Sequence, residues 1–536
     1  DLELELGPGT ADLKLRCGLH SGPVTAGVLR GERGRFQLFG DTVNTAARME
    51  STGKSNQVHL SQEFVDLLLD AGKSHWVTMR EDKVVAKGKG VMNTFWLNAT
   101  CPDLVDHKLV NAIAASEGMS SSSSGQNDYV HPEPAVAVDR TQGLVEWNLG
   151  IMKGALAKVI ASRQAQNVKP DSPQRLEEVE QEHMVDCTSL KEVKDILKLQ
   201  QVADKDNSNH GTVDLDDAIV SQLRAYIYSL SSLYNDNPFH NFQHATHVTM
   251  SVVKLMSRIC SPEEVDGASP TQDYSYGITS NPLTQFTVLL SALIHDVDHP
   301  GVPNGQLIKE NGPLTAVYAK SLAELNSLDL AWGLLMDDKY IDLRRAIYST
   351  EEEFLEFRQL LVNVVLATDV MDKDLGAQRK ERWTKAFAKK GSTSHTSLTS
   401  LTEEDVNRKA TIVLEHLIQA SDVAHTMQHW NVYAKWNERF FNECYAAYLA
   451  GRADKDPSEN WYKGEIGFFD FYVIPLAKKL KDCGVFGVSS AEYLRYAEQN
   501  RKEWEARGQD MVASFMEKIQ HPRRSSENGN TGNGVV

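Results

Sequence analysis

The chain has 536 residues, 41% of them hydrophobic, which is enough for two to four domains with ordinary buried cores. Its formal net charge is -17, and residues 1–100 hold twelve acids and twelve bases, so all of the excess acid lies downstream. This balance excludes a nucleic-acid binder, which needs a basic face, but not a phosphate substrate, because bound divalent metals can invert the local field. The six cysteines form no C-x-x-C pair, which favours free thiols in a reducing compartment. The longest apolar runs, such as Phe286–Ile294, are too short for the ~20 residues of a membrane-spanning helix.

The first hundred residues alternate short β-type runs with glycine-containing turns. We expect strands at residues 13–19, 35–39, 57–60, 84–87 and 94–97. Helices are predicted at Thr42–Glu50 and Ser61–Leu69, where Ser61 offers an N-cap and Glu63 lies in the first turn. Strands and helices mixed at this spacing indicate an α+β unit.

The composition changes after residue 100. Residues 101–140, with the serine run Ser120–Ser124, are predicted to be a disordered linker, and residues 141–214 a helical connector broken at Pro170 and Pro173. From 215 to 520 the pattern is helical and strand signals are nearly absent, which predicts an all-α domain. Residues 521–536 have the composition of a disordered tail.

Four apolar stripes at helical spacing support the all-α prediction. They are Leu223, Ile227 and Leu230; Val248, Val252, Leu255 and Met256; Leu283, Phe286, Leu290 and Leu293; and Ala410, Leu414 and Ile418. Thr402-Glu-Glu-Asp405 is a capping box for the fourth helix.

Histidines and aspartates gather at three places in the helical region. His240-Asn-Phe-Gln-His244 places two imidazoles four residues apart, on one face if the segment is helical, and His295-Asp296 follows an apolar helix. Asp422 ends the fourth stripe. A lone histidine on an apolar helix is usually a satisfied core residue, but several inward imidazoles and carboxylates are costly to bury unless they share a cation. Neutral histidine and ionised aspartate suit zinc, manganese or magnesium.

Five motifs of this region together resemble the class I cyclic-nucleotide phosphodiesterases. They are Phe239–Val248 (F-H-N-x-x-H-A-x-x-V), His295–Asn304 (H-D-V-D-H-P-G-V-x-N), Leu366–Asp369, Ala420–Asp422 and Gly467–Asp470. The motifs occur in the family's order and at its spacings over about residues 215–515. The resemblance implies an HD-type, all-α phosphodiesterase domain that hydrolyses cAMP, cGMP or both to 5′-monophosphates.

The resemblance also implies a centre of two divalent metal ions, Zn²⁺ with Mg²⁺ or Mn²⁺. The positions that match the ligands of the first metal are His244, His295, Asp296 and Asp422. Asp296 also matches the bridge to the second metal, whose remaining shell is mostly water. Three further positions match residues that hold ligands and waters: His299, Glu324 and Asp369.

The implied mechanism uses a hydroxide that bridges the two metals as the nucleophile on phosphorus. His240 matches the general acid, which gives a proton to the leaving 3′-oxygen. Phe468 matches the aromatic residue that stacks on the nucleotide base.

The chain departs from the family's pattern at four places. Phe239 replaces the usual tyrosine, and Glu324-Leu-Asn-Ser327 replaces Glu-Asn-His-His. His425 stands where the family has asparagine, and Glu465 stands where it has the base-reading glutamine. An ionised carboxylate only accepts hydrogen bonds, so Glu465 could accept from adenine N6 or from guanine N1 and N2. The choice between cAMP and cGMP therefore stays open.

Residues 13–97 resemble the C-terminal part of a class III nucleotide cyclase, which implies a truncated ferredoxin-like fold. The carrying motifs include Leu15–Gly22, Arg35–Glu50 and Lys87–Gly90. Asn44 and Arg48 lie four apart on one face of a predicted helix, so they could act together on a phosphate. In the family these positions are the transition-state pair.

Two more positions of this segment match functional residues of the cyclases. Lys87 matches a phosphate contact. Gln37 occupies the position that distinguishes ATP from GTP and matches neither class, so this choice is open as well.

The family binds its two metals through aspartates of earlier strands and forms its sites between two subunits. Residues 1–12 are too short to hold those segments, so we expect this chain alone to make no cyclic nucleotide. A longer parent protein would both synthesise and hydrolyse cyclic nucleotide, and its cyclase half would dimerise. By analogy, a missing N-terminal region would place the otherwise cytoplasmic chain on the cytoplasmic face of a membrane.

Two alternatives to the phosphodiesterase stay open at this stage. If the cyclase segment, or the altered residues around the metal ligands, no longer support catalysis, the chain would be a cyclic-nucleotide sensor without turnover. An HD-type domain could also perform phosphorolysis or another metal-dependent hydrolysis. Clean conversion of a 3′,5′-cyclic nucleotide to its 5′-monophosphate separates the phosphodiesterase from both.

Overall fold

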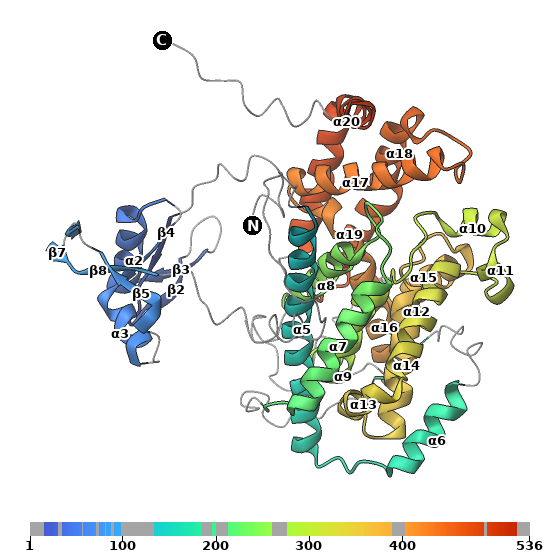
Figure 1. The fold of residues 1–536 in the computed structure, drawn as a ribbon, viewed down its shortest axis with the longest axis horizontal. Coiled ribbons are helices and arrows are strands. Elements are labelled where there is room, and N and C mark those ends of the chain that lie inside the picture. The colour runs from blue at the N-terminus through green and yellow to red at the C-terminus, as the bar shows by residue number, and fades with distance from the viewer. Residues whose placement is uncertain are drawn as a thin grey trace, which may run out of the picture. The chain divides into compact units, whose positions relative to one another are not determined.

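The computed structural model describes residues 16–29, 35–55, 57–70, 74–80, 82–86, 90–97, 133–184, 196–199, 213–259, 276–387, 402–486 and 490–521. The chain divides into two compact units, residues 1–130 and 131–536, and we describe each by itself (Figure 1). The small unit combines strands and helices, and the large unit is helical.

The small unit is built from short strands and two helices. Its elements are β1 (Arg16–Leu19), β2 (Thr25–Leu29), β3 (Arg35–Phe39), α2 (Asp41–Thr52), β4 (Gln57–Ser61), α3 (Gln62–Asp70), η1 (Ser74–Trp76), β5 (Val77–Met79), β6 (Val84–Ala86), β7 (Gly90–Met92) and β8 (Thr94–Leu97). One sheet has the order β1-β4-β8-β5, with β1 and β4 parallel and the other pairs antiparallel. The strands β2 and β3, and likewise β6 and β7, form separate antiparallel pairs.

The predicted α+β character of this segment is confirmed. Ser61 accepts a hydrogen bond from the Phe64 amide at 3.4 Å, as expected of the start of α3. Gly18 is required by packing, because a Cβ atom there would lie 2.7 Å from the carbonyl oxygen of Ala46 on α2. The strands β2, β5 and β7 were not predicted, since each is a short run with little alternation.

The large unit contains almost only helices among its described residues. They are α5 (Glu133–Gln166), α6 (Pro173–Met184), α7 (Asp217–Leu233), α8 (Phe242–Met256), α9 (Pro282–Ile294), α10 (Asn304–Glu310), α11 (Pro313–Val317), α12 (Leu322–Leu335), η5 (Asp338–Tyr340), α13 (Ile341–Ile347), α14 (Glu351–Leu366), α15 (Lys373–Phe387), α16 (Glu403–Asp422), η7 (Ala424–Met427), α17 (Trp430–Leu449), η8 (Pro457–Glu459), α18 (Trp461–Phe468), η9 (Phe469–Val473), α19 (Ile474–Asp482) and α20 (Ser490–Gln520). The predicted all-α fold is therefore confirmed.

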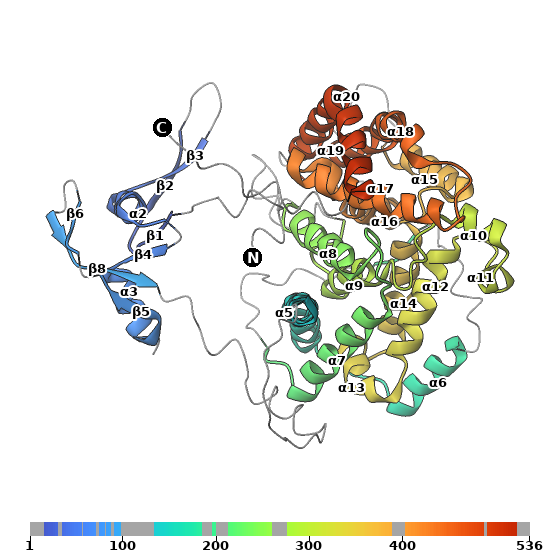
Figure 2. The same ribbon diagram turned by 45° about the horizontal axis from the view of Figure 1, so that its top comes forward.

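The helix α9 lies at the centre of this unit. It is buried over nearly its whole circumference and packs against α5, α8 and α14, as Figures 1 and 2 show. Asn281 caps its first turn by accepting from the Thr284 amide at 3.1 Å, and Pro282 follows at the first helical position. A helix that is apolar all round must be a core helix, and this one delivers His295 to the interior at its C-terminal end.

The fourth predicted stripe forms α16, and the N-cap of its predicted capping box is present. Thr402 accepts a hydrogen bond from the Asp405 amide at 3.1 Å. The helix then runs without interruption to Asp422. The helical path from α18 to α19 is less regular, because Pro475 has no amide proton to donate and the preceding residues widen into the π-helical turn η9.

The helix α5 begins earlier than expected and is more deeply packed. The linker was predicted to reach residue 140, whereas the helix starts at Glu133. The described side chains of α5 bury an apolar stripe against α7 and α9: Val145, Leu149, Met152, Leu156 and Val159. The predicted break is present between Gln166 and Pro173. The rest of the expected linker and the expected C-terminal tail after 521 lie outside the described residues.

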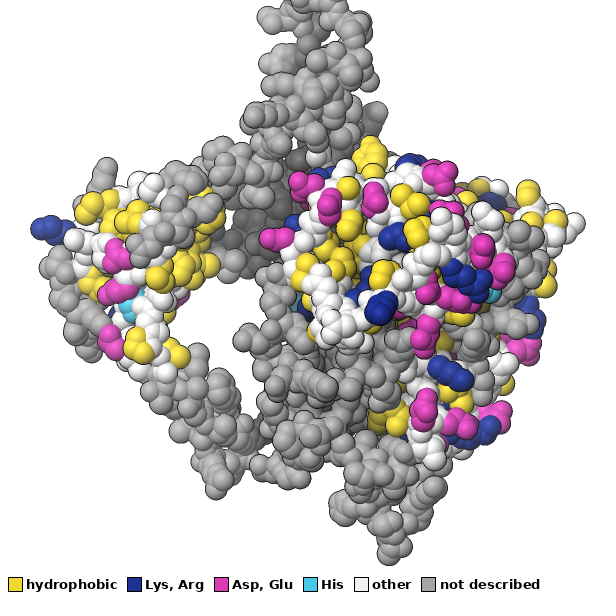
Figure 3. Space-filling view, turned by 90° about the horizontal axis from the view of Figure 1, so that it is seen from below, with side chains coloured by type: hydrophobic (Ala, Val, Ile, Leu, Met, Phe, Trp, Pro, Cys, Tyr) yellow, Lys and Arg dark blue, Asp and Glu magenta, His cyan; other side chains and the backbone are white. Residues whose placement is uncertain are grey.

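The visible surface of the large unit intersperses acidic and basic side chains with hydrophobic ones (Figure 3). Many of the charges are in exposed ion pairs, such as Arg452 with Glu310 at 2.9 Å, which contribute little to stability. None of the helices that the structure describes is both long enough and apolar enough to span a membrane.

Candidate active site

Three helices of the large unit bring the four predicted metal ligands together. His244 lies in the first turn of α8, whose N-cap Asn241 accepts from the His244 amide at 3.0 Å. His295 and Asp296 follow α9 directly, and Asp422 is the last residue of α16. One of the predictions needs a correction. His240 precedes the N-cap, so it does not share a helical face with His244.

The four side chains point their ligand atoms at one another. His244 Nε2 lies 3.1 Å from Asp422 Oδ1 and 3.6 Å from Asp296 Oδ2. His295 Nε2 lies 3.0 Å from Asp296 Oδ2 and 3.5 Å from Asp422 Oδ1. Ligand atoms that share one metal at ~2.1 Å are expected about 3.0–3.4 Å apart. These residues therefore fit a metal ion.

The chemistry of the donor atoms agrees with that fit. His295 Nε2 and Asp296 Oδ2 are buried without a hydrogen-bond partner, although they face each other. His295 Nδ1 lies 3.0 Å from the Ala292 carbonyl oxygen, so this nitrogen donates there and Nε2 is the atom that faces the carboxylates. Burial opposes a charge on His295, but Asp296 and Asp422 raise its pKa well above the usual value in the chain without metal, so metal binding would release the Nε2 proton. Burial lowers the pKa of His244, which favours the neutral ligand form.

The two carboxylates are held ionised in the chain without metal. Burial opposes their charge, but the neighbouring histidines outweigh it. His295 and His240 bring the pKa of Asp296 well below its usual value. His244 and His295 do the same for the pKa of Asp422. Ionised aspartate is the form that binds a divalent cation.

A second group, His240 with Glu443, lies beside the ligands. Glu443 Oε2 accepts from the backbone amides of Phe239 and His240, both at 2.9 Å, and Glu443 Oε1 pairs with His240 Nδ1. Burial opposes the charge on both side chains. Asp296 and Glu443 nevertheless raise the pKa of His240, and His240 lowers the pKa of Glu443 to about 2. Both shifts favour a protonated imidazole on an ionised carboxylate.

Glu443 was not predicted from the sequence. It lies on α17, about two hundred residues after His240, and belongs to no motif. The signal that the sequence offers is an acid close to two aromatic residues, in Phe440-Phe441-Asn-Glu443. Such a neighbourhood suggests burial, and the structure shows Glu443 buried.

His299 lies against the general-acid candidate. Its ring stacks on that of His240 with the centroids 3.9 Å apart. Its Nδ1 accepts from the Gly301 amide at 3.2 Å. Burial and the neighbouring His240 lower the pKa of His299 to about 3, so this imidazole is neutral.

Glu324 and Asp369 share one amide group. Asn304 Nδ2 donates to Glu324 Oε2 at 2.8 Å and lies 3.3 Å from Asp369 Oδ2, which also accepts from Ser321 Oγ at 2.7 Å. Burial and the charge of Asp369 raise the pKa of Glu324 to about 7. The structure therefore brings together Glu324 and Asp369, two of the residues predicted to hold ligands and waters. Asn304 contacts both of them.

Two of the residues that depart from the family's pattern support the turn carrying the ligands. Asn326 Nδ2 donates to Asp298 Oδ2 at 3.0 Å, and Ser327 Oγ donates to the Val297 carbonyl at 2.7 Å. Asp298 has a φ of 58°, which is uncommon for a residue other than glycine, so the turn is held in place by contacts like these.

Each of the two units of the chain matches a known protein family. Residues 239–485 match the family model of the 3′5′-cyclic nucleotide phosphodiesterases, and residues 6–99 match that of the adenylate and guanylate cyclase catalytic domain. The large unit is a cyclic-nucleotide phosphodiesterase domain. The small unit carries a segment of a cyclase catalytic domain.

Several relatives of the two halves are known. A probable 3′,5′-cyclic-AMP phosphodiesterase of Caenorhabditis elegans is 26% identical over 298 residues, which is 54% of this chain and 40% of that protein. A receptor-type guanylate cyclase of the same organism is 45% identical over 95 residues, 18% of this chain and 8% of that protein. The retinal guanylyl cyclase 2 of Bos taurus is 49% identical over 85 residues, 16% of this chain and 8% of that protein. The chain thus spans less than half the length of each of these relatives.

The phosphodiesterase domain also has a counterpart among solved structures. The phosphodiesterase domain of the Salpingoeca rosetta rhodopsin phosphodiesterase aligns with a TM-score of 0.42 and 22% identity, covering 56% of this chain and 83% of that one.

The predicted base-binding positions of the phosphodiesterase domain lie on η7, which holds His425, and on α18, which holds Glu465 and Phe468. Glu465 is buried and its Oε2 accepts from Tyr433 Oη at 2.8 Å. Burial raises the pKa of Glu465 to about 7, against hydrogen bonds from Tyr433 and Asn437. The ring of Phe468 stacks on that of Tyr472, with the centroids 5.4 Å apart.

His425 follows the metal ligand Asp422 and is buried in η7. Burial lowers its pKa well below the usual value, so it is neutral. Its ring meets that of Phe239 edge to face, with the centroids 5.6 Å apart. His425 therefore packs on the segment that presents His240.

The cyclase residues are only partly described. Asn44 and Arg48 lie four residues apart on α2, and Asn44 is exposed. Gln37 lies on β3, but its side chain is outside the described residues, as is the whole of Lys87.

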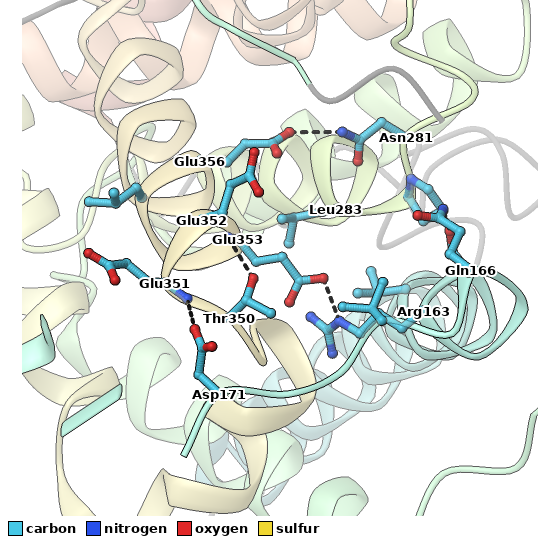
Figure 4. Close-up of a pocket in the computed structure, with 15 residues that line it drawn as sticks. Arg163, Gln166, Asp171, Asn281, Leu283, Thr350, Glu351, Glu352, Glu353 and Glu356 are labelled. Atoms are coloured by element: carbon cyan, nitrogen blue, oxygen red, sulfur yellow. Dashed lines mark hydrogen bonds and ion pairs between the residues drawn. The ribbon is translucent and has the colours of Figure 1, made fainter. Parts of the chain in front are cut away.

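A cavity of about 590 Å³ lies away from the metal ligands, between the end of α5 and the starts of α9 and α14 (Figure 4). The acidic residues that line this cavity are explained by local structural roles and do not require a ligand. Glu353 pairs with Arg163 at 2.7 Å, and the Glu351 amide donates to Asp171 at 2.8 Å. Glu351, Glu352 and Glu353 also occupy the first turn of α14, where acids complement the helix dipole. We therefore assign the chemistry to the histidine–aspartate centre.

Proposed function

We propose that the chain hydrolyses 3′,5′-cyclic nucleotides to 5′-monophosphates at a centre of two divalent cations, Zn²⁺ with Mg²⁺ or Mn²⁺. The observation that carries the proposal is the His240–Glu443 pair beside four converging ligands. A metal centre without such a pair would lack a proton donor for the leaving oxygen.

His244, His295, Asp296 and Asp422 would hold the first cation, and by the family resemblance Asp296 would also be a ligand of the second. The bound cations supply charge neutralisation of the phosphodiester and an activated water. Glu324 and Asp369, joined by Asn304, would orient the waters and ligands of a bound second cation.

The chain's own contribution to bond cleavage is the proton of His240. Because Nδ1 is engaged by Glu443, the proton that can be transferred is on Nε2. As the bond between phosphorus and the 3′-oxygen breaks, the 3′-oxygen takes this proton and leaves as a hydroxyl. Glu443 keeps the ring oriented and stabilises its charged form, as a buried carboxylate does for a catalytic histidine elsewhere.

His425, Glu465 and Phe468 take the base. A protonated Glu465 both donates and accepts, which suits the N1 and N6 of adenine, whereas an ionised Glu465 only accepts, which suits the N1 and N2 donors of guanine. Since the pKa of Glu465 is raised to about 7, both forms are present near neutral pH. The chain is therefore expected to accept both cAMP and cGMP.

We propose a supporting role for the small unit in the parent protein. Asn44 and Arg48 on α2 bind the phosphates of a nucleoside triphosphate in a site completed by a second cyclase segment, so that this half dimerises. The likeness to receptor-type cyclases supports a location on the cytoplasmic face of a membrane.

The test uses the full chain, stripped of metal with a chelator and then restored with Mg²⁺ or Mn²⁺, and follows initial rates on cAMP and cGMP. Restored turnover to the 5′-monophosphate supports the proposal, and Asp422→Ala serves as the control that should stay inactive. Tight nucleotide binding without turnover would instead support the alternative of a sensor, which the replacement of the base-reading glutamine by Glu465 favours.

A further inference from the structure

The helix α5 belongs physically to the phosphodiesterase domain, although it precedes the family match at 239–485. It packs against α7, α8 and α9, and α8 and α9 each carry a ligand of the metal centre near one end. The C-terminal part of α5 is anchored by Arg163, which donates to Glu353 at 2.7 Å and to the Ala346 carbonyl at 2.6 Å. A shift of α5 would therefore displace α8 and α9, and with them the ligands His244 and His295.

One polar residue interrupts the buried seam of α5. Asn148 is fully buried, and its Nδ2 donates to Thr246 Oγ1 at 2.9 Å and to the Leu144 carbonyl at 2.9 Å. Its Oδ1 has no hydrogen-bond partner among the described residues. Thr246 lies on α8, two residues after the ligand His244, and its hydroxyl donates to the Phe242 carbonyl at 2.9 Å.

Stability does not account for an asparagine at this position. Its buried acceptor is unsatisfied, and the neighbouring positions on the seam are Val145, Leu149 and Met152. A leucine has the same branching and number of side-chain heavy atoms, is somewhat larger, and would bury no unpaired oxygen. A single buried asparagine on a helix seam is, however, a known way to fix the register of two helices at a cost in stability.

We propose that Asn148 is a positioning residue of the phosphodiesterase site. Its hydrogen bond to Thr246 fixes the register of α5 against α8, and thereby holds His244 Nε2 in place 3.1 Å from Asp422. The helix α5 is in this way the N-terminal part of the catalytic domain. The kinetic readout of this inference rests on the proposed function, and its metal-binding readout does not.

The experiment compares four single variants of the full chain and the double variant Asn148→Leu/Thr246→Val. Asn148→Leu and Thr246→Val each remove the hydrogen bond between the helices, and Thr246→Ser keeps the hydroxyl. Thr249→Val is the matched control, because Thr249 is also buried on α8 and its hydroxyl donates only along the helix, to the Ala245 carbonyl at 2.9 Å. For each variant, kcat, KM, the Zn²⁺ affinity of the metal-stripped chain and the thermal unfolding midpoint are measured.

We expect Asn148→Leu and Thr246→Val each to lower kcat roughly 3- to 30-fold and to weaken Zn²⁺ binding, with KM little changed. The double variant should be no worse than either single variant, because both remove the same bond. Asn148→Leu should unfold at the same temperature as the wild type or higher, which a purely structural role would not produce. Thr246→Ser and Thr249→Val should behave like the wild type.

Wild-type kcat and Zn²⁺ affinity in Asn148→Leu would overturn the inference. So would an equal loss in Thr246→Val and Thr249→Val, since the hydrogen bond between helices would then be irrelevant. If the wild-type chain hydrolysed no cyclic nucleotide, the proposed function would fail, but the Zn²⁺ affinities measured by equilibrium dialysis would still decide the role of Asn148.

Discussion

The two sides of the phosphodiesterase site are built in different ways. On the metal side, four ligand atoms from α8, α9 and α16 converge within 3.6 Å of their neighbours, and every residue matches the family's pattern. On the base side, Glu465 and His425 both replace amide residues, and buried aromatic and amide groups hold Glu465 in place. In the proposed function, the metal side therefore carries the reaction, whereas the base side decides the substrate.

The difference has a physical reason. Metal ligands must meet narrow demands of charge, distance and direction, so few residue types are compatible with the site. A base is read by a pattern of donors and acceptors, which glutamine, glutamate and histidine can each present in part. The predictions below separate the two sides, beginning with the largest effect.

Asp422→Ala should abolish turnover of both cAMP and cGMP to background, because it removes a carboxylate that faces both His244 and His295. The measurement is the rate of 5′-monophosphate formation together with the metal content of the dialysed protein. Retained metal with normal turnover would contradict the ligand assignment.

His240→Ala should keep the bound metal but slow kcat by ~10²–10⁴, the usual scale for a general acid. A substrate with a more acidic leaving group should lose less of its kcat in this variant, because such a group can leave as an anion without a proton from His240. If the variant were fully active on cAMP and cGMP, the role of His240 would be wrong.

Glu443→Gln should reduce kcat by ~10- to 100-fold, less than the loss of the imidazole itself. The amide can still accept hydrogen bonds from the Phe239 and His240 backbone, but it no longer stabilises the charged ring. Kinetics at several pH values check this, with Asp329→Asn, an acid on α12, as a control for the loss of a carboxylate. Equal effects in both variants would argue against a specific pair.

Glu465→Gln should change the ratio of kcat/KM for cAMP and cGMP by about 10-fold or more while leaving metal content unaltered. The physical reason is that an amide presents a donor and an acceptor at every pH, whereas the carboxyl does so only when protonated. An unchanged ratio would remove Glu465 from the reading of the base.

The smallest expected effect is a pH dependence of that same ratio. The pKa of Glu465 is raised to about 7, so the group is protonated below this pH and ionised above it. The ratio of cGMP to cAMP hydrolysis should therefore rise from pH 6 to pH 8, and Glu465→Gln should flatten the change. A ratio that is constant in the wild type would show that Glu465 keeps one protonation state.

Much of the large unit could be predicted from the sequence, because helical apolar stripes and capping residues are local signals. Thr402 and the stripe ending at Asp422 are examples, and the metal ligands followed from motif resemblance. Glu443, Asn304 and Asn148 could not be assigned roles, since each acts through a contact with a residue distant in sequence. A shared face for His240 and His244 was expected only if the segment is helical, and this condition fails at His240, because the helix begins after the N-cap Asn241, which accepts from the His244 amide.

The small unit illustrates the same limit. The helix α2 and the strand β8 were predicted at nearly their observed bounds, whereas β2 and β5 gave no clear alternation. Such short strands are defined by their pairing with β3 and β8, which is information that no local window contains.

The most direct test of the central claim is product analysis in ¹⁸O-labelled water with the full chain, Mn²⁺ and either cyclic nucleotide. The account predicts a 5′-monophosphate that carries a single ¹⁸O on phosphorus and a 3′-oxygen without label, because water attacks phosphorus and His240 protonates the leaving oxygen. Bound metal and bound nucleotide without any labelled product, or label on the sugar oxygen, would contradict it.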